Sequence, residues 1–363
     1  MITLNYAEKI TKKEIIKKFG DINKTINSPI NSIIYGDNFE ILASLLKQGF
    51  ENKIDLVYID PPFATNNDFI IGERISTISQ NKEGNLAYTD KFSKEEYLNF
   101  LYERIYLIYK ILSEKGSFYL HIDCKIGHYV KIILDEIFGP ENFISEITRK
   151  KSNPKNFSRK AYGNEKDVIY FYAKNKGEHI YNDVTIPFTE EEILEKYNKI
   201  DNIGRRYNTV PIHAPGESNG VTGGKWRNMS PPSGRHWRTS PEELDKLDKE
   251  GLIEWSKNNN PRLKKFANEH KGKKIQDIWL NFKDPMYPIY PTQKNLEMLE
   301  MIVMQSSNKN SIVLDCFSGS GTTLLAAKNK GREYIGIDNS EIAIEIARKR
   351  LEEDFIKQLQ LTS

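Results

Sequence analysis

The tetrapeptide Asp60-Pro61-Pro62-Phe63 carries the clearest chemical signal in the sequence. It ends an apolar run, 54–59, of the kind that forms a buried parallel strand. Two consecutive prolines stiffen the turn and remove two N–H donors, so the carboxylate and a proline carbonyl can both accept from one exocyclic amine. The ring of Phe63 could stack on the ring that bears this amine. The motif predicts direct transfer of a methyl group to an amine nitrogen, without a covalent enzyme intermediate. The alternative is a turn that only ends the strand.

A glycine-rich turn between Asp315 and Thr323 forms a second candidate site. It joins a predicted strand, 311–314, to a helix that begins at Thr322. Glycines allow a ligand to approach the backbone closely, and the first turn of a helix presents unpaired N–H groups. The turn lacks the third glycine of the dinucleotide-binding pattern and the Gly-Lys pair of a phosphate-binding loop, so it predicts a different ligand.

Two carboxylates restrict the class of ligand that this turn can bind. Asp315 ends the first strand, and Asp338, 23 residues further on, ends the next one. A carboxylate at the second position can bind both hydroxyls of a ribose, whereas Asp315 would repel a pyrophosphate and could bind an amino group. The pair favours a nucleoside that carries an ammonium group, such as S-adenosyl-L-methionine, over a nicotinamide dinucleotide. A tight turn with acidic helix caps is the alternative.

The elements around these motifs alternate between strand and helix, which predicts a parallel sheet. Apolar runs such as 32–35 and 54–59 alternate with helical patterns early in the chain, and the alternation returns near its end. We expect an α/β fold with a doubly wound, mostly parallel sheet. Ligands bind beyond the carboxyl ends of central strands in such a sheet, so if the strands 54–59 and 311–314 are neighbours, Asp60 and Asp315 face one crevice. Residues 64–92 lack periodicity and are expected to form a loop.

The middle of the chain interrupts this alternation. Residues 175–276 are rich in Gly, Pro, Asn and Trp and show no steady order of strand and helix. We therefore expect a separate insertion there, between a first part of the main domain, 1–174, and a second part, 277–363. Helical patterns are also expected at 6–19 and 292–305.

Two stretches of this insertion carry a local excess of positive charge. Residues 205–238 hold six Lys or Arg side chains and one carboxylate, Glu217, and 257–274 hold seven and one. Trp and His stand among these cations, which suits phosphate, stacking and base-edge contacts with DNA; a solvated charged face is the alternative. A shorter basic stretch begins at Arg149. The candidate contacts are Lys151, Asn153, Arg205, Arg206, Lys225, Arg227, Arg235, His236, Arg238 and Lys264.

The chain resembles the β class of amino-group DNA methyltransferases, which modify adenine N6 or cytosine N4. The D-P-P-F tetrapeptide is similar to the catalytic D-P-P-[YF] motif of that family, and residues 317–321 are similar to its F-x-G-x-G cofactor motif. Residues 290–294 resemble the Y-P-T-Q-K-P segment beside the methionine part of the cofactor, but Asn295 replaces the final proline, which predicts a less rigid turn. Residues 36–38 resemble the segment near the cofactor adenine.

This resemblance implies a circularly permuted, Rossmann-like fold, because the catalytic motif precedes the cofactor motif. It also implies S-adenosyl-L-methionine as cofactor, double-stranded DNA as substrate, and residues 175–276 as the target-recognition region. The target base must leave the duplex stack to be reached. The residues carried over as catalytic are Asp60, Pro61, Pro62 and Phe63. Those carried over as cofactor-binding are Asp37, Asn38, Asp60, Thr292, Lys294, Asp315, Phe317, Gly319, Gly321, Thr322 and Asp338.

The leading Asp60 of the motif favours adenine N6 as the acceptor. The alternatives are N4-cytosine methylation and a non-catalytic DNA-recognition subunit of a modification system. The resemblance further implies a prokaryotic or phage origin and a cytoplasmic location. Two further partners are expected with it: a second copy of the chain in a homodimer, and a cognate restriction endonuclease on a separate chain.

Composition and cysteine placement exclude several other classes. The 363 residues carry a net charge of +3, too little for a uniformly cationic protein that wraps nucleic acid. Cys124 and Cys316 do not follow a proline as the nucleophile of a cytosine-C5 methyltransferase does, and two cysteines exclude a disulfide scaffold. The histidines and cysteines show no zinc spacing, so no metal is expected. No apolar run approaches the roughly 18 residues of a membrane span, so no membrane partner is expected.

Overall fold

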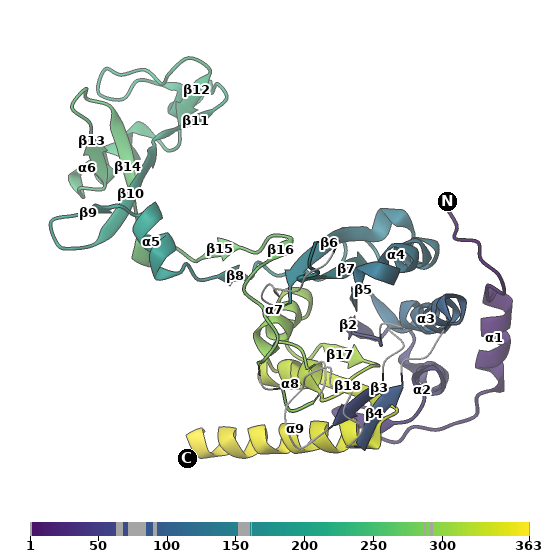
Figure 1. Cartoon of the computed structure of the whole chain (residues 1–363). Coiled ribbons are helices and arrows are strands. Elements are labelled where there is room, and N and C mark those ends of the chain that lie inside the picture. Colours follow the sequence, from purple (N-terminus) through teal and green to yellow (C-terminus); the bar gives the residue numbers. More distant parts are fainter. Residues whose placement is uncertain are drawn as a thin grey trace. The chain divides into compact units, whose positions relative to one another are not determined.

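The chain forms two compact units (Figure 1). The computed structural model describes residues 2–62, 68–71, 85–89, 93–151, 160, 162–286, 288–290 and 293–362. Unit 1 comprises the residues up to Val184 and from Gln276 onward, and unit 2 comprises Thr185–Ile275. Unit 2 begins ten residues later than the insertion expected from the sequence, because the intervening segment bonds to unit 1. Its Ile180 N–H donates to Lys115 O at 3.0 Å, for example.

Unit 1 is built on one eight-stranded sheet with the strand order β1-β18-β17-β2-β5-β7-β6-β16. All described pairs are parallel except the two made by β7, which runs opposite to its neighbours β5 and β6. The doubly wound, mostly parallel fold expected from the sequence is confirmed. The strands are β1 (Ser32–Tyr35), β2 (Ile54–Ile59), β5 (Leu112–Ile122), β6 (Phe143–Lys150), β7 (Lys166–Ala173), β16 (Ile278–Trp279), β17 (Ile312–Asp315) and β18 (Glu333–Asp338).

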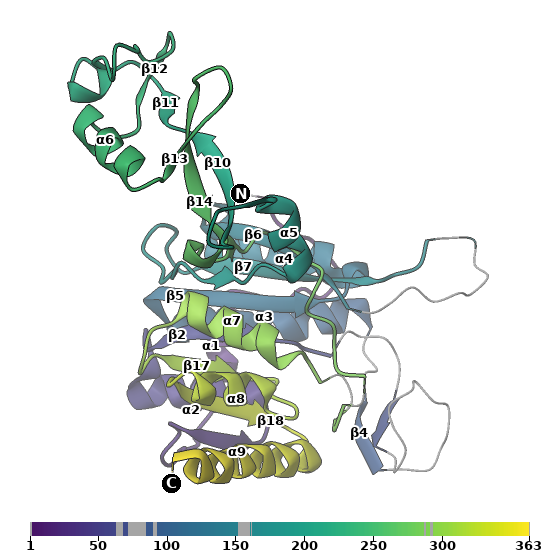
Figure 2. The same cartoon turned by 90° about the vertical axis from the view of Figure 1, so that its left-hand side faces the viewer.

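Helices cover both faces of this sheet, as Figure 2 shows. One face carries α2, α3 and α4, whose apolar residues form one core with β2 and β5. Figure 1 shows α1 outside α3. The other face carries α7, α8 and α9. None of the described helices is long and apolar enough to cross a membrane. Their bounds are α1 (Lys12–Asp21), α2 (Asn38–Leu45), α3 (Lys94–Ile111), α4 (Cys124–Phe138), α7 (Leu296–Ser306), α8 (Thr322–Asn329) and α9 (Glu341–Thr362).

Capping residues explain where two helices differ from the sequence predictions. The helix expected at 6–19 begins at Lys12, because Thr11 and Glu14 form a capping box there. The helix expected at 292–305 begins at Leu296, because Oδ1 of Asn295 accepts the N–H of Met298 at 2.9 Å. Nδ2 of Asn295 also donates to Lys283 O at 2.9 Å, and the expectation of a less rigid turn stays a prediction.

One further prediction about unit 1 needs correction. The segment 64–92, expected to be a loop, contains an antiparallel pair of β3 (Asp68–Ile71) and β4 (Asn85–Thr89), and its remaining residues lie outside the described ones. The antiparallel direction of β7 is compatible with the expected, mostly parallel sheet, but the sequence did not indicate it. The apolar run of β7 is buried on both faces and therefore reads the same in either direction.

Unit 2 has a core of its own. Its buried side chains Ile212, Trp226, Trp237, Leu244 and Ile253 pack together. A four-stranded antiparallel sheet, β13-β14-β10-β9, and a hairpin, β11-β12, surround them, and β8 pairs with β15 where the chain enters and leaves the unit. The elements are β8 (Thr185–Ile186), α5 (Glu190–Lys196), β9 (Lys199–Ile200), β10 (Arg206–Pro211), β11 (His213–Pro215), β12 (Arg235–Trp237), α6 (Pro241–Lys249), β13 (Ile253–Trp255), β14 (Pro261–Phe266) and β15 (Lys273–Lys274).

Candidate active site

Two carboxylates that are 255 residues apart in the sequence lie at the same edge of the sheet. β17 pairs with β2 in parallel, with Leu314 beside Val57. Asp315 is the last residue of β17, and Asp60 is the first residue after β2. The two strands are neighbours, which is the condition for Asp60 and Asp315 to face one crevice. The catalytic and cofactor motifs of the sequence therefore meet at one place.

Asp60 is held by a lysine from the far end of the chain. Its Oδ2 atom lies 2.5 Å from Nζ of Lys294, and the exposed fractions of the two side chains are 15% and 9%. Its Oδ1 atom is buried and accepts no hydrogen bond from any described residue. A buried acceptor without a donor costs about 1–3 kcal/mol, so Oδ1 suits a site that a ligand N–H group completes. Pro61 is buried next to Asp60 in the chain, and Phe63 lies outside the described residues.

Asp315 shapes the glycine-rich turn from inside. Its Oδ1 accepts the N–H of Phe317 at 3.0 Å, and its Oδ2 accepts the hydroxyl of Thr323 at 2.6 Å. Burial, together with the charges of Asp60 and Asp338, raises the pKa of Asp315 to about 7. Because both oxygens already accept donors of the chain, an amino group of a ligand would have to share them.

Asp338 anchors the other side of the turn. Its Oδ2 accepts the N–H of Gly319 at 2.7 Å and its Oδ1 accepts the N–H of Ser340 at 2.9 Å. Gly319 and Gly321 have φ values of +49° and +74°, which L side chains rarely adopt. A Cβ atom on Gly321 would also lie 2.8 Å from Cβ of Ala347. The turn therefore requires glycine at 321 for its backbone and for its packing.

One polar group of the turn has no partner among the described residues. The backbone N–H of Ser318 donates to Ile337 O at 3.0 Å, while its buried hydroxyl bonds to none of the described residues. Nη1 of Arg350 donates to Ser320 O at 2.6 Å and to Oγ1 of Thr322 at 3.0 Å. The sequence analysis missed Arg350, because its role depends on a contact between α9 and the turn.

Arg104 links the segment Asp37-Asn38 to the glycine-rich turn, and the sequence analysis missed it as well. It donates from Nη2 to Oδ2 of Asp37 at 2.9 Å and from Nε to Oδ1 of Asn38 at 2.5 Å. Nδ2 of Asn38 in turn donates to Cys316 O at 2.8 Å. The guanidinium stacks on Phe100 at 3.6 Å. An arginine within the apolar stripe of α3, at the spacing of Leu101, Ile105 and Ile108, is the signal that could have revealed it.

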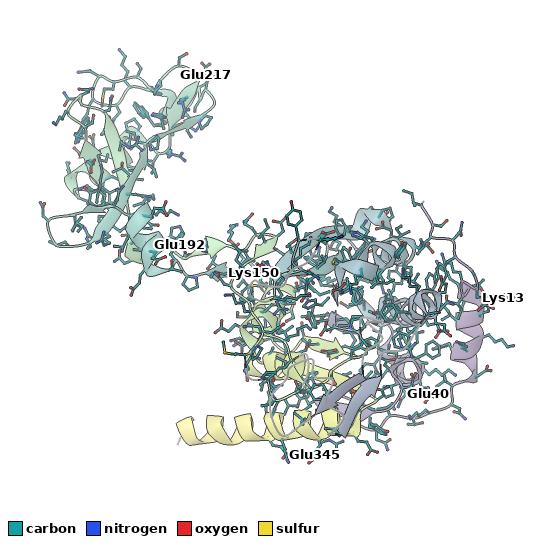
Figure 3. The ribbon with its side chains drawn as sticks, viewed as in Figure 1. Lys13, Glu40, Lys150, Glu192, Glu217 and Glu345 are labelled. Carbon is teal, nitrogen blue, oxygen red and sulfur yellow. The ribbon has the colours of Figure 1, made fainter. Side chains whose placement is uncertain are left out.

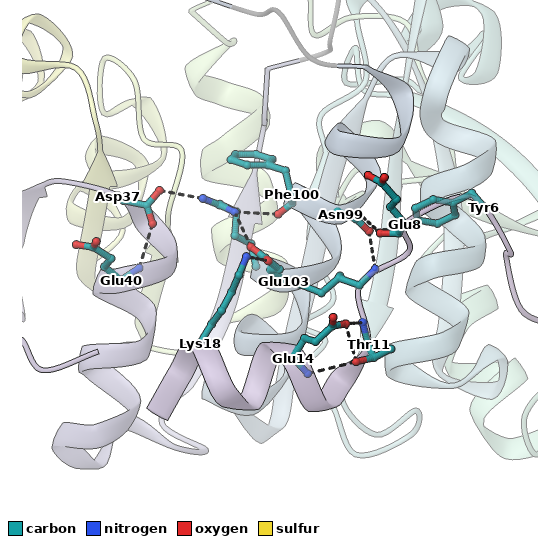
Figure 4. A network of polar contacts seen from close by, with 12 residues as sticks. Tyr6, Glu8, Thr11, Glu14, Lys18, Asp37, Glu40, Asn99, Phe100 and Glu103 are labelled. Carbon is teal, nitrogen blue, oxygen red and sulfur yellow. Dashed lines mark hydrogen bonds and ion pairs between the residues drawn. The ribbon is translucent and has the colours of Figure 1, made fainter. Parts of the chain in front are cut away.

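This contact is the inner end of a polar network that reaches α1 (Figure 4). Glu103, next to Arg104 on α3, pairs with Arg104 at 3.6 Å and also with Lys18 of α1. Asn99, one turn earlier, accepts the hydroxyl of Tyr6 at 2.8 Å through Oδ1. The segment before β1 is thereby tied to the same helix that positions Asp37 and Asn38.

A row of polar side chains starts on β2, the strand that precedes Asp60, and continues across β5 and β7 to β6. The hydroxyl of Tyr58 bonds to Nδ1 of His121 at 2.8 Å, and Nε2 of His121 bonds to Oδ2 of Asp167 at 3.0 Å. Arg149, fully buried, pairs with the same oxygen at 3.3 Å and with Asp284. We call Tyr58, His121, Asp167, Arg149 and Asp284 the polar row. Within the described residues, no group of three or more His, Cys, Asp or Glu side chains is arranged to hold a metal ion.

The predicted DNA-contacting residues divide into paired and unpaired cations. Arg205 pairs with Asp201 at 2.8 Å, and Arg227 pairs with Asp245 at 2.7 Å and with Asp248. Lys151 pairs with Asp167 of the polar row at 2.8 Å. These three cations are therefore already neutralised within the chain. Asn153 lies outside the described residues, as does Thr292 of the predicted cofactor site.

The other predicted DNA-contacting side chains of unit 2 have no carboxylate partner among the residues that the structure describes. Those on or beside the β11-β12 hairpin use part of their donors for local bonds: Arg235 to His213 and Arg238 to Pro211 O. Glu217, the one acid of 205–238, lies on the loop after β11 (Figure 3). The unpaired set is Arg206, Lys225, Arg235, His236, Arg238 and Lys264.

A family model described as DNA methylase, N6_N4_Mtase, matches residues 54–349. The type II methyltransferase M.EcaI of Enterobacter cloacae is 38% identical over 363 aligned residues, which cover 96% of this chain and 77% of that protein. The Mod subunit of the type III restriction-modification enzyme EcoP15I of Escherichia coli is 25% identical, and the match covers 80% of this chain. This chain spans about half the length of that subunit, with 54% of it covered.

Solved structures resemble the chain more distantly. The structure of M1.HpyAVI is 19% identical, with a TM-score of 0.48, and the match covers 88% of this chain and 98% of that one. A DNA modification methylase from Thermus thermophilus, in complex with S-adenosyl-L-methionine, is 16% identical, with a TM-score of 0.47 and coverages of 88% and 92%.

Proposed function

The chain belongs to the N6_N4_Mtase family of DNA methylases, and we propose that within this family it methylates the exocyclic N6 of adenine in double-stranded DNA. S-adenosyl-L-methionine is the methyl donor of the family. The observation that carries the proposal is the buried Oδ1 atom of Asp60, which bonds to no described residue and lies at the carboxyl end of β2. A carboxylate oxygen that can only accept suits the N–H group of an exocyclic amine.

The described residues fit this cofactor. The carboxylate of Asp338 would share its oxygens between ribose hydroxyls and the N–H groups of Gly319 and Ser340. The buried hydroxyl of Ser318 bonds to no described residue, and the N–H of Ser318 bonds to Ile337, next to Asp338. We infer that these two residues and the glycine-rich turn hold the nucleoside, and that Asp37 and Asn38 contact its base. When bound, S-adenosyl-L-methionine supplies a methyl group activated by a positively charged sulfur.

Asp60 and the diproline turn orient the acceptor in this proposal. Oδ1 of Asp60 accepts one N–H of the amine, and the carbonyl of Pro61 accepts the other. With both hydrogens held, the lone pair of the nitrogen faces the methyl group. The N–C bond would form as the bond between the methyl carbon and sulfur breaks, so that the positive charge passes to nitrogen. The carboxylate of Asp60 stabilises this charge until the extra proton leaves to water.

The choice of adenine over cytosine rests on the first residue of the motif. Cytosine N4 presents the same two N–H groups, so the geometry of Asp60 suits either base. Adenine is favoured because the motif begins with Asp, whereas N4-cytosine enzymes of this arrangement more often begin with Ser. The intact Asp60 and the complete glycine-rich turn argue against a non-catalytic recognition subunit.

Unit 2 supplies the DNA contacts in this proposal. Its unpaired cations suit phosphates and base edges, and a flipped base reaches Asp60 at the cost of a few kcal/mol of stacking. The names of the relatives support a role in restriction and modification, with a cognate endonuclease on a separate chain. A homodimer and a cytoplasmic location belong to the same proposal.

Nucleoside mass spectrometry tests the reaction and the base together. Unmethylated genomic DNA is incubated with S-adenosyl-L-methionine and either the wild-type protein or the Asp60→Ala variant. We expect N6-methyladenine with the wild type alone. N4-methylcytosine would overturn the choice of base, and an active Asp60→Ala variant would overturn the role of Asp60. Cofactor binding by a wild type that methylates no base would support the recognition subunit instead.

A further inference from the structure

Lys294 carries its charge in a place that largely excludes water. Its side chain is 9% exposed. Burial alone would lower the pKa of this ammonium, but the charges of Asp60, Asp284 and Asp167 raise it above its ordinary value. The lysine is thus a fixed cation among three carboxylates.

The other two carboxylates already have cations of their own. Asp284 and Asp167 both pair with Arg149, and Asp167 also pairs with Lys151 at 2.8 Å. The six groups balance as three carboxylates and three cations. Within the described part of the chain, Lys294 is therefore the counter-ion of Asp60, and the polar row supplies the negative surroundings that keep this lysine charged.

The backbone on either side fixes where this lysine stands. Lys294 directly precedes Asn295, which caps α7 through Oδ1 and bonds through Nδ2 to Lys283 O, next to Asp284. One asparagine thus ties the start of α7 to the segment that completes the polar row. The ammonium has little freedom to follow Asp60 if that carboxylate rotates.

We propose that Lys294 is the positioning residue of Asp60: it occupies Oδ2, prevents rotation of the carboxylate, and leaves Oδ1 as the single oxygen presented to the target amine. This rests on the function proposed above for Asp60. It differs from the role that the family resemblance implies, in which Lys294 binds the cofactor. A positioning residue governs the rate at saturation, whereas a cofactor-binding residue governs the dissociation constant.

Two substitutions of Lys294 and one control separate these roles. Lys294→Met removes the charge and keeps an unbranched chain, and Lys294→Arg keeps the charge. Lys174 provides a matched control, because it is equally buried and donates to Asn52 at 2.5 Å and to Leu112 O at 2.7 Å, away from the polar row. For each full-length variant we would measure the dissociation constant of S-adenosyl-L-methionine by calorimetry, the single-turnover rate with saturating DNA, and the thermal midpoint.

We expect Lys294→Met to lower the single-turnover rate about 100-fold, a cost typical of a misplaced reactive group, with the cofactor dissociation constant changed less than about threefold. Lys294→Arg should give an intermediate rate with the same dissociation constant. Lys174→Met should lower the thermal midpoint and leave the rate unchanged.

Three results would overturn the proposal. The first is a raised dissociation constant with an unchanged rate in Lys294→Met, which would make Lys294 a cofactor ligand. The second is a wild-type rate in both Lys294 variants. The third is an equal loss of rate in Lys174→Met. If Lys294→Met does not fold, Lys294→Arg decides, because a wild-type rate in it with a raised dissociation constant excludes positioning. An inactive wild type would refute the function of Asp60 and not this inference alone.

Discussion

Replacing Asp315 by Asn should stabilise the protein at neutral and alkaline pH. Its pKa is about 7 in the folded chain, against an ordinary value of 3.8, mainly because the carboxyl is buried. An acid whose pKa is raised by folding stabilises the fold fully below pH 3.8, and this contribution is lost as the pH rises through 7. About three pH units at 1.36 kcal/mol each amount to about 4 kcal/mol. Asn keeps an oxygen for the N–H of Phe317 and an amide that can donate to Thr323.

Urea unfolding of the wild type and the variant between pH 5 and 8, without cofactor, measures this effect. Subtracting the two curves cancels every other titrating group. The advantage of Asp315→Asn should grow by about 1.4 kcal/mol per pH unit and level off above pH 7. Thr323→Val removes a hydrogen bond that lowers the pKa of Asp315, so it should move the wild-type decline to higher pH. A difference that stays constant with pH would refute the reasoning.

Other predictions address the cofactor site and the DNA-contacting surface. Arg104→Met removes the donors that hold the start of α2, and should weaken S-adenosyl-L-methionine binding about tenfold in calorimetry; unchanged affinity would contradict its role. Gly321→Ala places a Cβ in a backbone region with φ +74° and against a neighbouring side chain, and should lower the free energy of unfolding in urea by about 1–3 kcal/mol. Arg235→Ala should weaken duplex binding and reduce its salt dependence by about one ion, whereas Arg205→Ala, whose guanidinium is paired internally, should change neither in anisotropy titrations.

The strands that carry the chemistry are predictable from local sequence. Each is a continuous apolar run that ends at a polar motif, and β2 has the bounds that its run predicts. The adjacency of β2 and β17 follows from chemistry, because two halves of one reaction must meet at one edge of a sheet. The roles of individual residues at that edge are predictions that mutagenesis must test.

The contacts that complete the site depend on distant partners. Arg104 bonds to Asn38, 66 residues away in the sequence. Lys294 pairs with Asp60, from which it is separated by 234 positions (294 − 60). Neither pairing can be recognised from the neighbouring sequence, which shows only a charged residue at an unusual position. The strands of unit 2 are hard to predict for a different reason. Several have only two or three residues, too few for a period to show.

The pairing of β8 with β15 allows unit 2 to be exchanged during evolution. Ile186 lies beside Lys273, so the chain leaves unit 2 next to the place where it enters, after 87 residues. A segment whose ends meet can be exchanged for one of another length without displacing the strands that flank it, since the entropy of closing a loop grows slowly with length. Because unit 2 also has its own core, recombination can replace it as one cassette. Under the proposal that unit 2 contacts the DNA, new sequence specificities can then arise in one step, while the sheet that carries Asp60 is inherited intact.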